Sequence, residues 1–514
     1  MQRGYAQKAP EKLSPKAYYN YNDYDRALDG YLEIWHDHQQ DLEINLHIAT
    51  CYLHVNGDKS KAIPYLSYLV REGNKDEEVT FMLGQAYLYA LNIDEALKYF
   101  NAYRAKTIPK NYELADLYIS YCNNAKEMIA HPLNVTFENL GKDVNTKYPD
   151  YYPFIVESDS TLYYTARRET NTGNITSFEG YYTSDIYVSR NVNGVFQKSK
   201  NLGTFINTPE DEQCVYMTPN GKNMIIYVDN AKLKIAGDLF MTSTDKGKAF
   251  PKPTGFKDPV NTEFSELEGC ITSNLNMMII SSDRPGGIGD MDLYMVERGD
   301  GDKWKEPINL GPNINTKFGE AFPVFDEASN TLYFASEGPK SMGGYDIFKS
   351  KFDPKTKQFG PAVNLGYPIN TTDDNMIFSL AANKRDGYES LYMPGGIGDL
   401  DIYKVSFCTT LKGKVVTEDS IADLTAVISI LKRNGTLVAK KEITAKDNTY
   451  DFTLATGKYI IDVKSPGCID YIEDITLDDK VGYVPVHKTT IILQHPHATT
   501  KPVKNAKKHP PAKK

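Results

Sequence analysis

Residues 331–348, with the sequence TLYFASEGPKSMGGYDIF, decide the fold of this chain. Two runs rich in aromatic and aliphatic residues flank a Gly-Gly pair, a pattern typical of two strands joined by a turn. Similar runs near residues 321–325 and 359–363 bring the number of strands expected in this unit to four. A four-stranded unit that recurs along a chain predicts the blade of a β-propeller, because one blade cannot bury both of its faces alone.

The unit does recur. An Asn-Thr pair returns at spacings of 62, 54, 54 and 55 residues, and an Asp followed by an aliphatic and an aromatic residue returns at 53, 54, 54 and 55. The first residues of the Asn-Thr pairs are Asn145, Asn207, Asn261, Asn315 and Asn370. The aspartates of the second series are Asp185, Asp238, Asp292, Asp346 and Asp401. Two series in step predict an all-β propeller over residues 135–406 with five blades, or six if the longer first unit hides a partial blade.

The repeated polar residues are expected to build turns. Asn and Asp side chains hydrogen-bond turn backbone, and here each Asp stands once per unit directly before a strand. Cation binding is the alternative at Asp290 and Asp292. The Gly-Gly-Ile-Gly-Asp runs beginning at Gly286 and Gly395 precede strands rather than helices, which favours turns with positive φ over phosphate-binding loops.

Residues 17–130 show helical periodicity with an internal repeat near 34 residues. One series of small residues is spaced by 35 and 34 positions, and a second series pairs a small residue with a Tyr three positions later. These predicted packing positions are Ala27, Ala62 and Ala96 in the first series and Ala49, Tyr52, Gly84 and Tyr87 in the second. Small residues let paired helices approach closely, so an all-α array of helical hairpins is predicted after a flexible segment, residues 1–16.

The last part of the chain predicts a small β-sandwich over residues 408–494, formed from short alternating strands. Residues 495–514 are rich in Lys and Pro and too poor in apolar residues to fold, so a disordered tail is expected. Cys408 and Cys468 fall in the same predicted domain and could pair, although two buried free thiols are favoured. Cys214 and Cys270 each follow a Glu by two positions, and we expect them to lie in equivalent first strands of consecutive blades with buried packing as their role.

Charge and hydropathy exclude several classes of function. The net charge is −9, and residues 501–514 hold six Lys and no acid, so the remainder carries about −15. An acidic body argues against nucleic-acid binding, which needs basic patches. No run of 18 apolar residues predicts a membrane-spanning segment, and the first residues, from Met1 to Lys8, do not form the apolar core of a signal peptide. No motif indicates catalytic, cofactor-binding or metal-binding residues.

The three parts resemble known families. The helical repeat is similar to the tetratricopeptide repeat, and the Asn-Thr, Leu-Tyr-Phe-Ala-Ser, Gly-Gly and Asp-Ile-Tyr elements resemble the TolB-like propeller. The Gly-x-Val, Asn-Gly and Leu-x-x-Gly-Lys-Tyr elements of residues 411–467 resemble the carboxypeptidase regulatory-like domain, a transthyretin-like sandwich. In this order they resemble the PorE-like periplasmic proteins of Bacteroidota, in which an OmpA-like domain normally follows.

That resemblance implies a non-enzymatic scaffold or adaptor, periplasmic and associated with the outer membrane, in the type IX secretion or gliding machinery. Its implied partners are envelope or secretion-system proteins, bound through the helical repeats and the propeller, with peptidoglycan as an indirect partner. The alternative is a propeller that binds glycans or peptidoglycan fragments. The Tyr-rich segments 148–152 and 181–182 favour this alternative, because tyrosine rings stack on sugars.

Overall fold

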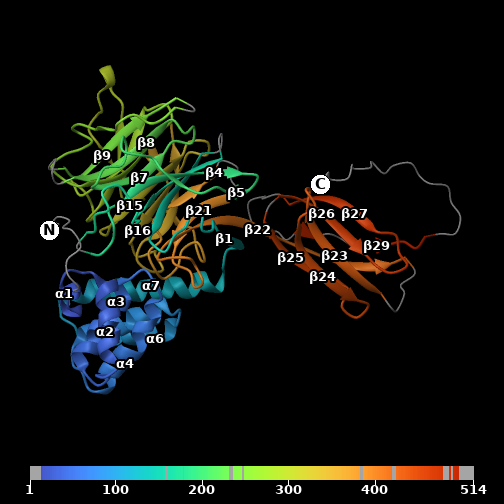
Figure 1. The fold of residues 1–514 in the computed structure, drawn as a ribbon, viewed down its shortest axis with the longest axis horizontal. Helices are drawn as coiled ribbons and strands as arrows, with labels where there is room; N and C mark the ends of the chain where they lie inside the picture. The colour runs from blue at the N-terminus through green and yellow to red at the C-terminus, as the bar shows by residue number, and fades with distance from the viewer. Residues whose placement is uncertain are drawn as a thin grey trace. The chain divides into compact units, whose positions relative to one another are not determined.

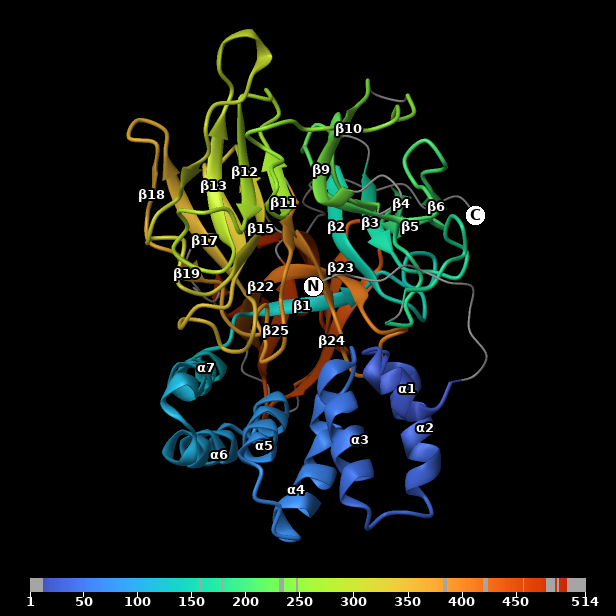
Figure 2. The ribbon, with the colours of Figure 1, turned by 90° about the vertical axis from the view of Figure 1, so that its left-hand side faces the viewer.

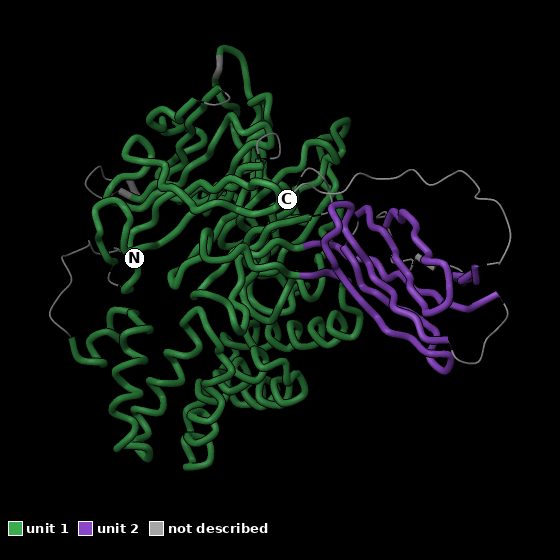
Figure 3. Tube along the Cα trace, turned by 45° about the vertical axis from the view of Figure 1, so that its right-hand side comes forward, with its two compact units in different colours: residues 1–133, 137–405 green, residues 134–136, 406–514 purple. Residues whose placement is uncertain are grey.

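The structure is a computed structural model, and it describes residues 13–156, 160–177, 179–230, 235–245, 248–381, 386–418, 424–455, 457–477, 486–487 and 490–496. Of the expected flexible segment 1–16, residues 1–12 lie outside this set, and helix α1 begins at Pro15. Of the expected tail, residues 497–514 lie outside it as well. The described residues divide into two compact units, residues 1–133 with 137–405 and residues 134–136 with 406–514 (Figure 3).

The first unit opens with the predicted helices, and this helical part is confirmed (Figure 1). Aspartates at the N-caps of three of these helices accept hydrogen bonds from the first turn, which satisfies otherwise unpaired backbone N–H groups. The helices are α1 (Pro15–Asn20), α2 (Tyr24–Trp35), α3 (Leu42–His54), α4 (Ile63–Arg71), α5 (Glu77–Tyr89), α6 (Ile93–Lys106) and α7 (Tyr112–Ala130), with the 3-10 turns η1 (Lys59–Ala62) and η2 (Pro109–Asn111).

The small residues of the helical repeat lie where helices meet. Ala27, Ala49, Ala62 and Ala96 are 0% exposed. A Cβ on Gly84 would lie 2.7 Å from the Phe100 ring, so only glycine fits this helix crossing. The two tyrosines of the repeat are half-buried and stack on rings of the following helix, Tyr52 on Tyr65 and Tyr87 on Tyr99.

The antiparallel sheets are also confirmed, and the described residues of the first unit form five of them. In blades 1 to 4 the first, second and third strands are long and one or two short outer strands follow, whereas the first strand of blade 5 has only 3 residues. Blade 1 contains β2 (Asp150–Val156), β3 (Thr161–Ala166), β4 (Asp185–Val192), β5 (Val195–Phe196) and β6 (Lys200–Asn201); blade 2 β7 (Asp211–Met217), β8 (Asn223–Asn230), β9 (Ile235–Ser243) and β10 (Thr254–Gly255); blade 3 β11 (Glu266–Ile271), β12 (Met277–Ser282), β13 (Asp292–Glu297) and β14 (Ile308–Asn309); blade 4 β15 (Glu320–Asp326), β16 (Thr331–Ser336), β17 (Asp346–Asp353), β18 (Gln358–Phe359) and β19 (Val363–Asn364); blade 5 β20 (Phe378–Leu380), β21 (Asp386–Leu391), β22 (Asp401–Thr417) and β1 (Val135–Asn139).

The five sheets close into a ring. The first strands lie side by side in the order β2, β7, β11, β15 and β20, and β20 returns to β2, so these strands surround a central channel. Strand β1, from the start of the propeller sequence, supplies the outer strand of blade 5 beside β22, and this pairing joins the two ends of the ring. In Figure 2 the helices lie in a row along one face of the propeller.

The second unit is a β-sandwich of two sheets. One sheet has the strand order β24-β23-β26-β27, and in the other β22 pairs with β25, β28 and β29. Their inward side chains form one apolar core that includes Val415, Ile428, Ile461 and Leu477. The strands not yet given are β23 (Thr425–Lys432), β24 (Leu437–Thr444), β25 (Thr449–Ala455), β26 (Gly457–Lys464), β27 (Tyr471–Leu477), β28 (Val486–His487) and β29 (Ile491–Leu493).

Candidate functional site

The five repeated asparagines make the same pair of hydrogen bonds in every blade. In each case the side-chain oxygen accepts from the backbone N–H of the residue that follows the repeated Asp, and the side-chain amide donates to the carbonyl of that same residue. Asn207, for example, binds Ile186 N–H at 2.9 Å and its carbonyl at 3.0 Å. Asn261, Asn315, Asn370 and Asn145 bind Leu239, Leu293, Ile347 and Ile402 in the same way.

The repeated aspartates fix the loop before the third strand. Asp185 accepts from the backbone N–H and hydroxyl of Thr172 and from the amide of Asn201. Asp292, Asp346 and Asp401 likewise accept from loop N–H groups and from an Asn of the outer strand. These four carboxylates thus lie in separate blades, each engaged with its own turn. Asp238 begins the corresponding stretch of β9 and is half-buried.

A further repeated position was not recognised in the sequence. Five residues after each Asn stands Asp150, Glu212, Glu266, Glu320 or Asn375, and each accepts hydrogen bonds from the preceding Thr. All five are at most 2% exposed. The constant spacing was a usable signal, but the change of residue type between blades concealed it.

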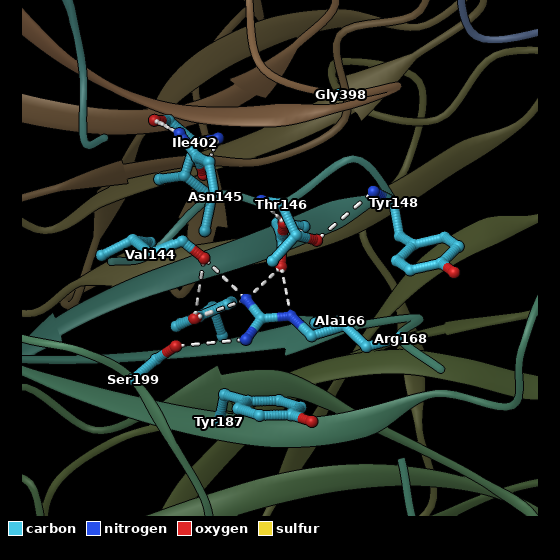
Figure 4. A network of polar contacts seen from close by, with 12 residues as sticks. Val144, Asn145, Thr146, Tyr148, Ala166, Arg168, Tyr187, Ser199, Gly398 and Ile402 are labelled. Carbon is cyan, nitrogen blue, oxygen red and sulfur yellow. Dashed lines mark hydrogen bonds and ion pairs between the residues drawn. The ribbon is translucent and has the colours of Figure 1, made fainter. Parts of the chain in front are cut away.

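Two blades neutralise this buried acid with an arginine. Arg168 donates to Asp150 at 3.1 Å, to Ser199 and to the Val144 carbonyl, and its guanidinium lies 4.3 Å from the centre of the Tyr187 ring (Figure 4). Burial raises the pKa of Asp150, and the attraction of Arg168 opposes that shift. In blade 3 the guanidinium of Arg284 donates to Glu266 at 2.9 Å.

Two other blades leave the acid without a cation. Among the described residues, no basic side chain pairs with Glu212 or Glu320. Burial raises the pKa of Glu212 to about 8 and that of Glu320 to about 7, against the lowering effect of their Thr donors. These two carboxyl groups therefore hold a proton at neutral pH much more readily than ordinary glutamates do.

A β-bulge recurs in the first strands of four blades, two residues after the acid. Strand register shifts there in β2, β7, β11 and β15, and Tyr152 and Phe322 have positive φ values of 54° and 53°. The position holds Tyr152, Cys214, Glu268, Phe322 and Ile377. As expected, Cys214 and Cys270 lie in the first strands of consecutive blades and are 0% and 1% exposed; within these strands Cys214 corresponds in position to Glu268.

Aromatic side chains plug the channel. The ring of Tyr152 lies 5.4 Å from that of Phe322, although their strands β2 and β15 are not neighbours in the ring. Another pair, Phe154 and Tyr216, packs at 5.7 Å. The channel consequently ends within the propeller and opens as a cavity at its mouth.

The channel-mouth cavity has a volume of about 340 Å³, within the range of small-ligand sites. Tyr151, Tyr152, Tyr181 and Tyr392 supply rings to its wall. Asn56 and Lys59 belong to the helical array, so the cavity lies between helices and propeller. The remaining lining residues are Pro149, Arg167, Glu179, Gln213, Thr371, Asp373, Asp374, Asn375, Met376, Ile377, Ser390, Leu391 and Leu400.

Polar contacts position several of these groups. Lys59 Nζ lies 2.5 Å from Asp373 Oδ1, and the Arg167 guanidinium donates to the Tyr151 hydroxyl at 3.3 Å. The Tyr181 hydroxyl donates to Asp25 of α2 at 2.7 Å. The structure thus brings tyrosines of the two Tyr-rich segments of the sequence analysis into one site with Lys59 and Asp373, which are 314 positions apart in the sequence.

The described residues contain no group of three or more His, Cys, Asp and Glu side chains placed to hold a metal ion. The six cysteines are free thiols. Cys408 and Cys468 are only partly buried, which corrects the expectation that both lie in the core. No helix among the described residues has the length and apolarity that crossing a membrane requires.

Comparisons with known proteins find only distant similarity to solved structures. No protein-family model and no curated protein matches the chain. Similar solved structures include a glycoside hydrolase (7% identity, 55% of this chain and 94% of the other, TM-score 0.37) and a β-xylosidase (12%, 59% and 98%, 0.33). An α-L-arabinofuranosidase from Lactobacillus brevis has 11% identity over 56% of this chain and 93% of its own, with a TM-score of 0.33. Similarity at this level carries no inference about the activity of this chain.

Proposed function

We propose that this protein is a non-enzymatic scaffold of the bacterial periplasm, which holds proteins of an outer-membrane-associated assembly together, in the type IX secretion or gliding machinery. In this proposal the helical hairpins are tetratricopeptide repeats, the ring is a TolB-like propeller and the sandwich is a carboxypeptidase regulatory-like domain. The observation that supports it is the fixed junction between the helices and the propeller.

The junction is built from polar contacts along several helices. Tyr121 of α7 donates to the Glu337 carbonyl, and the Asn124 amide donates to two carbonyls of the same propeller loop, each at 2.8 Å. Lys59 and Asp25 make the contacts already described at the other end of the row. A junction held at both ends keeps two recognition surfaces at constant spacing, which a scaffold requires.

The helical array also presents apolar side chains to solvent. Leu42, Ile108 and Leu114 are between 41% and 50% exposed, and large exposed apolar residues on a repeat array suit protein binding. The test is affinity capture of the tagged full-length chain from envelope extracts. We expect capture of a secretion-complex protein that Leu42→Asp abolishes and Val363→Asp, an exposed change on strand β19, leaves intact. Recovery of no envelope protein, or equal recovery by both variants, contradicts the scaffold.

A second function, saccharide binding, is favoured by the channel-mouth cavity. Its tyrosine rings can stack on the C–H faces of a sugar, while Gln213, Asn375 and the carboxylates can hydrogen-bond hydroxyl groups. Tyr392 is suitable for a test because it lines the cavity and is only half-buried. Calorimetric titration with soluble glycan fragments should give saturable binding that Tyr392→Ala weakens. Heats equal to dilution for every fragment contradict this function.

A further inference from the structure

The charges that line the channel-mouth cavity do not balance. Three carboxylates, Glu179, Asp373 and Asp374, face two cations, Lys59 and Arg167. Both cations already have protein partners. Lys59 pairs with Asp373 at 2.5 Å, and Arg167 binds the Tyr151 hydroxyl and lies 3.8 Å from Asp211, outside the lining set.

Asp374 and Glu179 form no direct ion pair among the described residues, although Lys59 acts on the charge of Asp374 and Glu179 acts on that of Arg167. Among the described residues neither makes an ion pair, and both side chains are accessible to solvent. Asp374 is held in place, because its Oδ1 accepts from Tyr345 N–H at 2.9 Å and a Cβ on Gly344 would lie 2.0 Å from that oxygen. Its partly enclosed position and the neighbouring Asp373 raise the pKa of Asp374, and the Tyr345 N–H and the charge of Lys59 oppose that shift.

A buried acid that makes no ion pair among the described residues occupies the bulge position of blade 3. Glu268 occupies the same bulge position as Tyr152, which lines the cavity, and burial raises the pKa of Glu268 to about 8. It is 8% exposed, and its Oε2 has no hydrogen-bond partner.

We propose that the channel-mouth cavity binds the ammonium group of a small amino sugar, with Asp374 and Glu179 as the carboxylates that receive it. The proposal rests on the saccharide-binding function and names the class of sugar. An ammonium group donates three hydrogen bonds and supplies the missing positive charge. Tyrosine rings in the wall add favourable cation–π attraction, as Arg167 already shows 5.8 Å from the Tyr181 ring.

Other ligand classes fit less well. An anionic ligand would meet the surplus of carboxylates, since neither Lys59 nor Arg167 is available without losing a partner. A divalent metal ion requires several converging ligands, and the described residues offer no group of three. A neutral sugar would use the rings and the amides but would leave the charge of Asp374 uncompensated in a partly enclosed site.

The test is calorimetric titration of the full-length protein with matched methyl glycosides of glucosamine, N-acetylglucosamine and glucose. We expect the glucosamine derivative to bind at least tenfold more tightly than the other two, a difference of about 1.4 kcal/mol. Asp374→Asn should abolish that preference while retaining the acceptor for Tyr345 N–H, and Glu179→Gln should reduce it. Asp353→Asn, an exposed aspartate of the β17–β18 hairpin, is the matched control and should change nothing. Thermal melting confirms that each variant is folded.

The remaining outcomes separate the two proposals. Nα-acetyl-lysine methylamide carries the same ammonium group without a sugar, and binding of this compound alone supports the ammonium site but contradicts saccharide binding. Equal affinity for the glucosamine and N-acetylglucosamine derivatives overturns the ammonium proposal and leaves saccharide binding in place. Binding of none of the four compounds overturns both.

Discussion

Glu212 is the residue whose replacement best tests how the propeller accommodates its buried acids. It is 2% exposed, and its two carboxylate oxygens accept from the N–H and the hydroxyl of Thr208. Burial raises its pKa to about 8 in the folded protein, whereas an unfolded glutamate has a pKa of about 4.3. Folded Glu212 therefore retains a proton that the unfolded chain has lost, over the window between these two values.

The sign of the pH dependence follows from that difference. Because the folded state binds more protons between pH 4.5 and 8, the stability that Glu212 contributes is present in full below its unfolded pKa and is lost as pH rises towards 8. One pKa unit corresponds to about 1.4 kcal/mol, so the free energy of unfolding should fall by roughly 3 kcal/mol between pH 5 and pH 8 on account of this group.

Glu212→Gln removes the ionisable group and keeps the shape. Its amide oxygen can accept from Thr208 N–H, and its amide nitrogen can donate to the Thr208 hydroxyl, as a protonated carboxyl group would. We expect near wild-type stability at pH 5 and a gain of roughly 3 kcal/mol over wild type at pH 8. The assay is urea denaturation followed by circular dichroism at pH 5, 6.5 and 8.

Glu266→Gln is the matched contrast in blade 3. The same chemical change there leaves Arg284 buried without its carboxylate, which should cost about 3 kcal/mol at every pH. The reasoning is refuted if Glu212→Gln retains the wild-type pH dependence, or if both variants lose stability equally. Either result means that Glu212 is ionised in the folded protein.

Three further changes probe other contacts. Arg168→Leu should destabilise the propeller by about 3 kcal/mol in chemical denaturation because it leaves Asp150 buried without a cation, and adding Asp150→Asn should restore part of the loss. Asn145→Ala and Asn315→Ala should each cost about 2 kcal/mol by leaving a buried N–H and carbonyl unpaired, but only Asn145→Ala should speed hydrogen exchange in β1, where the ring closes; equal exchange in both contradicts that role. Tyr121→Phe removes one hydrogen bond between α7 and the propeller and should cost about 1 kcal/mol, detected as faster limited proteolysis of α7 with unchanged exchange in the blades.

The blades could be predicted from the sequence because each one uses the same polar contacts. Asn207 and Asn315 each accept a hydrogen bond from a backbone N–H and donate one to the carbonyl of the same residue. Because this pair of contacts requires the short amide side chain of Asn, the residue type repeats with the fold. The short outer strands were predicted less well, and the expected strand near residues 359–363 is divided into β18 and β19. A strand of two residues forms because a neighbouring strand offers it hydrogen bonds, and its own sequence carries little signal for it.

The channel-mouth cavity could not be predicted in the same way. Its walls combine residues from the helical array with loops of blades 1, 2 and 5, and Lys59 meets Asp373 across 314 positions of sequence. Tyr-rich segments indicated an aromatic site, but nothing local to residues 148–152 indicates that Asp374 will face them. These lining residues come together only when the ring of blades closes and the helices pack against it.

Comparing equivalent positions of the five blades distinguishes residues that stabilise the propeller fold from residues that can contact a ligand. At the five repeated asparagines, where every blade makes the same pair of backbone hydrogen bonds, one residue type is used throughout. At the bulge position the backbone geometry recurs, yet the side chains are Tyr, Cys, Glu, Phe and Ile. A position whose side chain the blade fold does not require is free to differ between blades. Here the differences put Tyr152 and Ile377 in the wall of the cavity and leave Oε2 of the buried Glu268 without a hydrogen-bond partner. The asymmetry of the channel is therefore the feature of this ring that a ligand can recognise.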